Sequence, residues 1–143
     1  MARCSFKMPE DFLQKISWLN ERTDEIVPRV LAAGGEVVLA KVRGNLRAVI
    51  GKGTKVKSRS TGELVAALGV SPAKMDRAGD FNVKVGFSEP RSGGGSNAKL
   101  ANVIEFGKHG QPAKPFLKPA KSQSRAECID AMKTKLEEEI SGI

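Results

Sequence analysis

Few residues in this 143-residue sequence have the types and spacing that catalysis or metal binding requires. His109 is the only histidine, and it lies between Lys108 and Gly110 in a loop-like stretch. Cys4 and Cys128 are far apart, and together with one histidine they supply fewer donors than a structural zinc site needs. Neither a GxSxG nucleophile motif nor a dinucleotide-binding fingerprint is present. We therefore expect an exposed His109, free thiols, no metal, no other cofactor and no enzymatic activity.

The segment Gly51-Lys52-Gly53-Thr54 invites a phosphate-loop interpretation, but it does not fit one. The Walker pattern is Gly-x-x-x-x-Gly-Lys-Ser/Thr. Leu46, five residues before Gly51, is not glycine, and Gly53 stands where serine or threonine is required. The sequence therefore predicts no nucleotide site here.

Positive charge is concentrated around the same segment. The formal net charge is +8, and residues 37–62 contain no acidic side chain. Such a run favours contact with a polyanion or with an acidic protein surface. We predict that residues 51–62 form a basic loop, which is either solvated or in contact with DNA or an acidic surface of a ring. The candidate contact residues are Lys52, Lys55, Lys57 and Arg59.

Length and composition fit a single domain over residues 1–143 with one sizeable core. There is no tyrosine and only one tryptophan, which argues against an aromatic surface for stacking nucleic-acid bases. No apolar run approaches the roughly 20 residues of a membrane span. The first residues lack the apolar core of a signal peptide. We expect a protein made in the cytoplasm that does not contact a membrane.

Apolar spacing predicts helices in the N-terminal part of the chain. Residues 9–19 form an amphipathic pattern, with Trp18 off its apolar face of Phe12, Leu13, Ile16 and Leu19. Thr23 is the expected N-cap of a long helix that runs to about Val49. Its expected buried stripe is Ile26, Val30, Ala33, Val37, Ala40, Gly44 and Ala48. Gly34 and Gly35 indicate close packing against this helix, and a kink is the alternative.

The middle of the chain alternates like an antiparallel hairpin. Thr61 or Ser60 can cap a helical turn at residues 63–67, with Leu64 and Leu68 pointing inward. Residues 68–73 and 81–87 are the expected strands, joined by a turn at 74–80. Residues 88–96 contain three consecutive glycines and predict a flexible loop.

Residues 97–120 predict a helix, a sharp stop, a rigid apolar segment and a second helix. Asn97 is the expected N-cap, Phe106 lies on the expected apolar face, and Gly107 is the expected C-cap. Prolines then stiffen the chain around Phe116 and Leu117, and Pro119 suits the first turn of a helix that runs to about Ile140. We expect Glu105, next to this stop, to pair with a lysine or arginine or to accept backbone N–H groups.

The order of these residues resembles the neck, or tail-completion, proteins that join head and tail in long-tailed (lambda-like, siphovirus-type) bacteriophages. That family has a Glu-aromatic-Gly step followed by Pro-Phe-Leu-Arg-Pro-Ala, and a Thr-Gly-x-Leu step upstream. The matching residues here are Thr61, Gly62, Leu64, Glu105, Phe106, Gly107, Pro115, Phe116, Leu117, Pro119 and Ala120, with Lys118 in place of arginine. The family often has an aromatic residue shortly before its Glu-aromatic-Gly step, where this chain has Leu100.

The resemblance implies an α+β fold, with a long N-terminal helix and a C-terminal helix packed on a small, mainly antiparallel curved sheet. It implies a virion structural protein at the head–tail interface. Such proteins form a ring, here a hexamer or dodecamer, between the portal or connector and the tail tube. The implied partners are other copies of the chain, head-completion proteins, and tail-terminator or tail-tube proteins, with genomic DNA only passing through. The alternative, which rests on charge alone, is a small basic nucleic-acid-binding protein that acts outside the particle.

Overall fold

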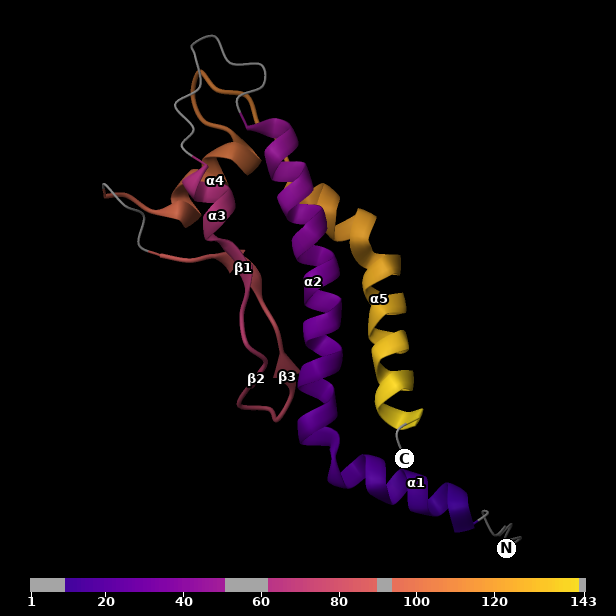
Figure 1. The fold of residues 1–143 in the computed structure, drawn as a ribbon. Helices are drawn as coiled ribbons and strands as arrows, with labels where there is room; N and C mark the ends of the chain where they lie inside the picture. The colour runs from indigo at the N-terminus through magenta and orange to yellow at the C-terminus, as the bar shows by residue number, and fades with distance from the viewer. Residues whose placement is uncertain (1–9, 51–61, 90–93, 142–143) are drawn as a thin grey trace, which may run out of the picture.

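The protein is a mixed α+β molecule, as predicted, and most of its regular structure is helical (Figure 1). The structure is a computed structural model that describes residues 10–50, 62–89 and 94–141. Basic residues 52–59 and Thr61 lie outside the described part of the chain. The elements are α1 (Glu10–Glu21), α2 (Thr23–Val49), α3 (Glu63–Ala67), β1 (Leu68–Val70), β2 (Lys74–Met75), β3 (Phe81–Asn82), β4 (Val85–Phe87), α4 (Asn97–Phe106) and α5 (Leu117–Ser141).

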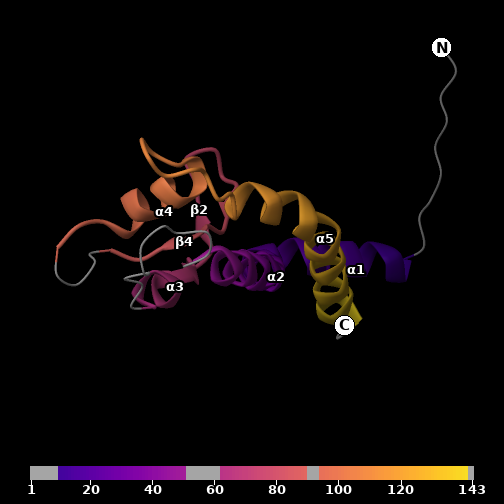
Figure 2. The same cartoon turned by 90° about the horizontal axis from the view of Figure 1, so that it is seen from above.

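Helix α2 forms the middle of the molecule, with α5 on one side and the β-hairpin on another (Figures 1 and 2). Two adjacent glycines in α2 allow α5 and the β-hairpin to pack close to its backbone. A Cβ atom on Gly34 would lie 2.7 Å from Cγ of Met132 in α5. A Cβ atom on Gly35 would lie 3.0 Å from Cγ1 of Val70 in β1. Successive residues of an α-helix point about 100° apart, so the pair serves two different neighbours. The predicted close packing is confirmed.

The core lies where α2, α3, α4 and the start of α5 meet. Phe116 is fully buried, and its ring meets that of Phe87 edge to face with centroids 6.3 Å apart. Leu64 and Leu68 point inward, as expected. The cluster contains Leu39, Val42, Leu46, Leu64, Leu68, Ala101, Phe116 and Ala120.

The predicted hairpin is present, but it is interrupted. Strand β1 pairs antiparallel with β4, and β2 pairs antiparallel with β3, in two separate ladders. Between β1 and β2 lies Pro72, which has no N–H to donate to a ladder. Ser71 bridges part of the gap, because its N–H donates to the Lys84 carbonyl and its hydroxyl accepts from the Lys84 N–H. The result is a short sheet in two pieces.

Two expectations for the long N-terminal helix are wrong, the second of them in part. Thr23 is not an N-cap: α1 turns into α2 at Arg22, and the Thr23 hydroxyl donates back to the Leu19 carbonyl at 2.9 Å. The expected stripe is buried only in its first half: Ile26 is buried, and Val30, Ala33 and Val37 are half-buried. Ala40, Gly44 and Ala48 are exposed, whereas α2 buries Ile26, Gly34, Leu39, Val42 and Leu46. A helix packed on more than one side does not bury a single stripe.

The expected apolar face of α1 is not buried in the chain. Leu13 and Ile16 are each 47% exposed, and Leu19 is half-buried. The Phe12 side chain lies outside the described part. In Figure 1, α1 leaves the base of α2 at an angle and runs past the C-terminal end of α5, away from the core. The helix is therefore an arm that carries apolar side chains in solvent.

Candidate functional site

Glu105, at the end of α4, holds the start of α5. Its Oε2 atom accepts hydrogen bonds from the N–H groups of Phe116 at 2.7 Å and Leu117 at 2.8 Å. Its Oε1 atom accepts from the Lys118 N–H at 3.0 Å. The first N–H groups of a helix have no partner within the helix, and a carboxylate also matches the positive end of the helix dipole. One side chain therefore caps α5 and joins two helices; we call this arrangement the Glu105 clamp.

The clamp is buried, yet it is built for the ionised carboxylate. Only 4% of Glu105 is exposed. Burial raises the pKa of this carboxyl, but the N–H groups of Phe116, Leu117 and Lys118 and the charge of Lys118 lower it by more, so the pKa lies below the ordinary value. Of the two partners expected for Glu105, the backbone N–H groups are confirmed. A carboxyl that is ionised and fully hydrogen-bonded here serves structure rather than proton transfer.

The loop after α4 is locked from several sides. Gly107 has φ +78° and ψ 177°, a conformation almost reserved for glycine, and its N–H caps α4 by donating to the Val103 carbonyl. A Cβ atom there would lie 2.7 Å from the Ala113 nitrogen and 2.8 Å from the Gln111 oxygen. The Lys114 N–H also donates to the Ile104 carbonyl at 2.7 Å. The predicted glycine stop is confirmed, and it forms a tight corner.

The corner presents Phe106 to solvent. The sequence predicts Phe106 on the apolar face of its helix, and this is wrong: 76% of the residue is exposed. Helix α4 instead turns Ala101 and Glu105 inward, four residues apart, and Phe106 follows on another side. His109 is exposed in the same loop, as expected. An exposed phenylalanine on a locked backbone is suited to contact another protein.

The remaining predicted site residues have mixed surroundings. Phe116 is buried, Leu117 and Pro119 are half-buried, and Pro115 is exposed. Pro119 is the third residue of α5 and so lies in its first turn, as predicted. Gly62 is exposed with φ +81° at the start of α3, and Leu64 is buried. The structure thus brings Glu105, Phe116 and Leu117 together; their role as a family anchor stays a prediction.

A second glutamate, Glu89, caps the start of α4 in the same way as Glu105 caps the start of α5. Glu89 accepts from the backbone N–H groups of Asn97 at 3.0 Å and Ala98 at 2.7 Å, and from the Ser96 hydroxyl at 2.8 Å. The Ala98 N–H, the Ser96 hydroxyl and the Asn97 N–H lower the pKa of this carboxyl. The N-cap is Ser96, whose hydroxyl accepts from the Lys99 N–H, so the expected Asn97 cap is wrong by one residue. We call this arrangement the Glu89 clamp.

Sequence reasoning missed three of these features. Glu89 lies seven residues before Ser96, and no regular spacing marks it as a cap. Asn97 is buried, and its side-chain amide donates to the Ser88 carbonyl. The Asn45 amide links α2 to α5 by donating to the Phe116 carbonyl and the Gln123 side chain. The Ser96 cap was missed as well, although it had a usable signal, since serine is as good an N-cap as asparagine.

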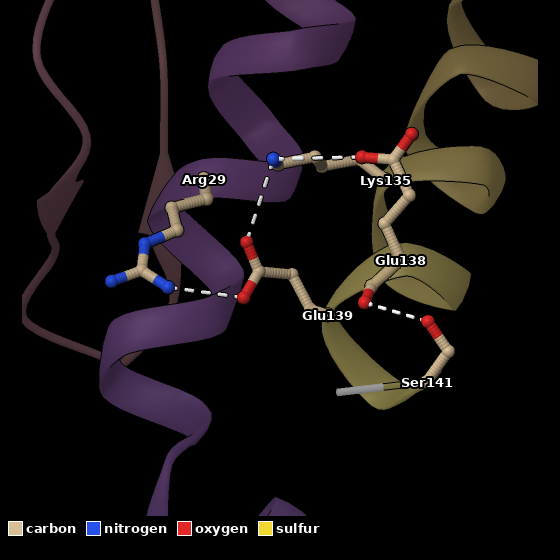
Figure 3. Close-up of polar contacts among 5 residues, drawn as sticks. All are labelled: Arg29, Lys135, Glu138, Glu139 and Ser141. Carbon is tan, nitrogen blue, oxygen red and sulfur yellow. Dashed lines mark hydrogen bonds and ion pairs between the residues drawn. The ribbon is translucent and has the colours of Figure 1, made fainter. Parts of the chain in front are cut away.

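A shallow hollow of about 290 Å³ lies in the elbow between α1, α2 and the end of α5. Trp18 lines this hollow and is half-buried. The Arg22 guanidinium lies over its ring, 5.0 Å from the ring centre. Figure 3 shows the polar side of the elbow, where Arg29 meets Glu139 at 3.0 Å and Lys135 reaches Glu138 and Glu139. Glu138 and Glu139, at the acidic end of α5, are therefore paired within the chain.

The described residues contain no group of three or more histidine, cysteine, aspartate or glutamate side chains that could hold a metal ion. Among the described helices, none is both long and apolar enough to span a membrane. What the geometry offers instead is surface for protein contacts: an exposed phenylalanine on a locked corner and an apolar arm.

Comparison with known proteins agrees with this description. A family model described as "Bacteriophage HK97-gp10, putative tail-component" matches residues 10–107. The match covers more than half of the chain, and the chain belongs to this HK97-gp10-like family. No curated protein and no solved structure matches.

Proposed function

We propose that this member of the HK97-gp10-like family is a structural protein of the bacteriophage head–tail junction. In this proposal, copies of the chain form a ring, a hexamer or dodecamer, between the portal-side connector and the tail tube. The family is one of phage tail components, which supports a place in the virion. A ring requires two different contact surfaces on each subunit.

The observation that carries the proposal is the rigid presentation of Phe106. The Glu105 clamp and the Gly107 corner fix the backbone on both sides of a residue that is 76% exposed. Solvating a phenylalanine is unfavourable, and ordering its backbone in advance lowers the entropy cost of binding. Both features are useful for contact with a head-completion, tail-terminator or tail-tube protein.

A phage that lacks this chain tests the proposal. We expect infected cells to accumulate DNA-filled heads and complete tails that do not join, as seen by electron microscopy of lysates. Supplying the chain in trans should restore joined particles. Joined, infectious particles in the absence of the chain would contradict a junction role. If the lysates contain heads but no tails, the chain is needed to build the tail rather than to join it to the head.

The basic residues Lys52, Lys55, Lys57 and Arg59 would face the DNA channel or the next ring in such an assembly. Changing all four to glutamine should impair joining or DNA retention while the thermal unfolding curve stays unchanged. If the free wild-type chain instead binds duplex DNA with an affinity that falls steeply with salt, the alternative of a nucleic-acid-binding protein gains support. Normal infectious particles from the four-fold variant would exclude the channel role.

A further inference from the structure

We propose that α1 of one copy docks on the outer face of α5 of a neighbouring copy, and that this contact closes the ring. This inference rests on the proposed function and names one surface pair that would build the assembly. Its basis is a match between two apolar faces of the same chain that residues 10–50, 62–89 and 94–141 leave uncovered.

The first face belongs to α1 and is the acidic member of the pair. Leu13 and Ile16 are three residues apart and exposed, so they lie on one side of the helix. Glu10 lies three residues before Leu13, and Glu21 eight residues after it, which places both carboxylates along the same side. Neither glutamate has an ion-pair partner among the residues that the structure describes. We call these four residues the arm face.

The second face belongs to α5 and is the basic member. Ile129 and Leu136, seven residues apart, are 39% and 37% exposed. Arg125 and Lys133 lie four residues before and after Ile129, so they border the same stripe. Both are exposed and make no ion pair within residues 10–50, 62–89 and 94–141. We call these four residues the stripe face.

The two faces match in length as well as in charge. Helix α1 has 12 residues, and the stripe face runs from Arg125 to Leu136, so each is about 18 Å long. The two carboxylates of the arm face would lie opposite the Arg125 guanidinium and the Lys133 ammonium of the stripe face. The two apolar side chains of each face would be buried against each other. Glu138 and Glu139, at the end of α5, are not part of this match, because Glu138 is bound to Lys135 and Glu139 to Arg29 and Lys135 (Figure 3).

The geometry also explains why the occupant is a second copy. Figure 1 shows α1 directed away from the core, past the end of α5 rather than along it. Each copy then offers one arm face and one stripe face at different places. Such a head-to-tail contact repeats from subunit to subunit and closes into a ring when the rotation permits. A contact between two arm faces would oppose four carboxylates and is disfavoured.

Charge reversal tests the pairing in phage particles. One variant carries Glu10→Lys and Glu21→Lys, a second carries Arg125→Glu and Lys133→Glu, and a third combines all four changes. Because like charges across an interface cost several kcal/mol, each of the first two variants should lower the copies per particle by at least about tenfold. The combined variant should recover most of the loss. A matched control, Lys74→Glu with Lys84→Glu on the exposed hairpin, should behave as wild type.

Cross-linking identifies the occupant directly. A benzophenone amino acid at position 13, in particles that contain isotopically light and heavy copies, should cross-link to the segment 125–136 of another copy. The same probe at Met75, which is 52% exposed on β2, is the control for nonspecific capture. The inference is overturned if the combined variant is no better than the single sets, if neither set has an effect, or if position 13 cross-links to a different virion protein. Absence of the wild-type chain from particles would instead remove the proposed function, and this inference with it.

Discussion

The Glu105 clamp and the Glu89 clamp use the same chemistry in different surroundings. Each carboxylate accepts hydrogen bonds from the first turn of a helix that follows it in the chain. Glu105 is buried beside Phe116, whereas Glu89 is exposed and precedes the glycine-rich loop. If Glu89 is lost, water can replace it; if Glu105 is lost, buried N–H groups have no substitute. Two caps with similar hydrogen bonds can therefore differ in how much they stabilise the fold, because one is buried and the other is exposed.

The largest effect should come from Glu105→Gln. A glutamine keeps the size of the side chain but turns an N–H₂ group towards backbone donors, so at least one buried N–H group loses its partner. We expect the free energy of unfolding to fall by about 3 to 4 kcal/mol, measured by urea denaturation. A loss below about 1 kcal/mol, the ordinary size for a surface position, would show that burial adds nothing to this clamp.

Replacing the glycine next to the Glu105 clamp should destabilise the protein more than replacing the glycine next to the Glu89 clamp. Gly107→Ala meets both a glycine-only backbone conformation and two backbone atoms within 2.8 Å, so we expect a loss of about 2 to 3 kcal/mol. Gly95 also has positive φ, at +90°, but open space around its Cβ position. Gly95→Ala should therefore cost only about 1 to 2 kcal/mol, for strain alone. Equal losses in the two variants would contradict a tight corner at Gly107.

Acid should reveal the Glu105 clamp through its lowered pKa. A carboxyl whose pKa is lower in the folded than in the unfolded protein stabilises the fold above the unfolded value, which is 4.5 for glutamate, and this stabilisation is lost as pH falls through the folded pKa. The wild-type chain should therefore lose stability below about pH 4.5. Glu105→Gln should show a shallower loss over the same range, measured by thermal unfolding at stepped pH. Parallel pH profiles would mean that Glu105 does not carry this linkage.

The smallest effect should come from Glu89→Gln. Its acceptor role passes partly to water and partly to Ser96, which caps the same helix. We expect a smaller change in the unfolding midpoint than for Ser96→Ala, whose cost is about 1 kcal/mol for a lost N-cap. If Glu89→Gln is as damaging as Glu105→Gln, then exposure does not distinguish the clamps.

Local signals in the sequence predicted the Glu105 clamp better than they predicted the helices around α2. Gly107 permits a backbone conformation that other residues avoid, and Pro119 fixes its own φ, so the stop of α4 and the start of α5 could be placed from residue type. The backbone acceptor role of Glu105 was one of two alternatives, and only tertiary contacts could decide between them. Thr23 and Asn97 are good capping types, but the neighbouring residues Arg22 and Ser96 occupy the cap positions.

The face that a helix buries depends on partners that spacing does not reveal. Helix α2 has α5 and the hairpin as neighbours, and its buried residues follow no single stripe. Helix α1 has a predicted apolar face, yet Leu13 and Ile16 are exposed, because none of the described helices and strands covers them. Phe106 is exposed although it is apolar, because Glu105 must point inward to reach α5. In the last two cases, the error of the sequence prediction marks a candidate contact surface.

Quantitative mass spectrometry of purified phage particles is the most direct test of a structural role at the head–tail junction. We expect the chain to be present in the copy number of a small ring, comparable with that of the portal protein in the same particles. A chain that is abundant in infected cells but missing from finished particles would contradict a structural role at the head–tail junction.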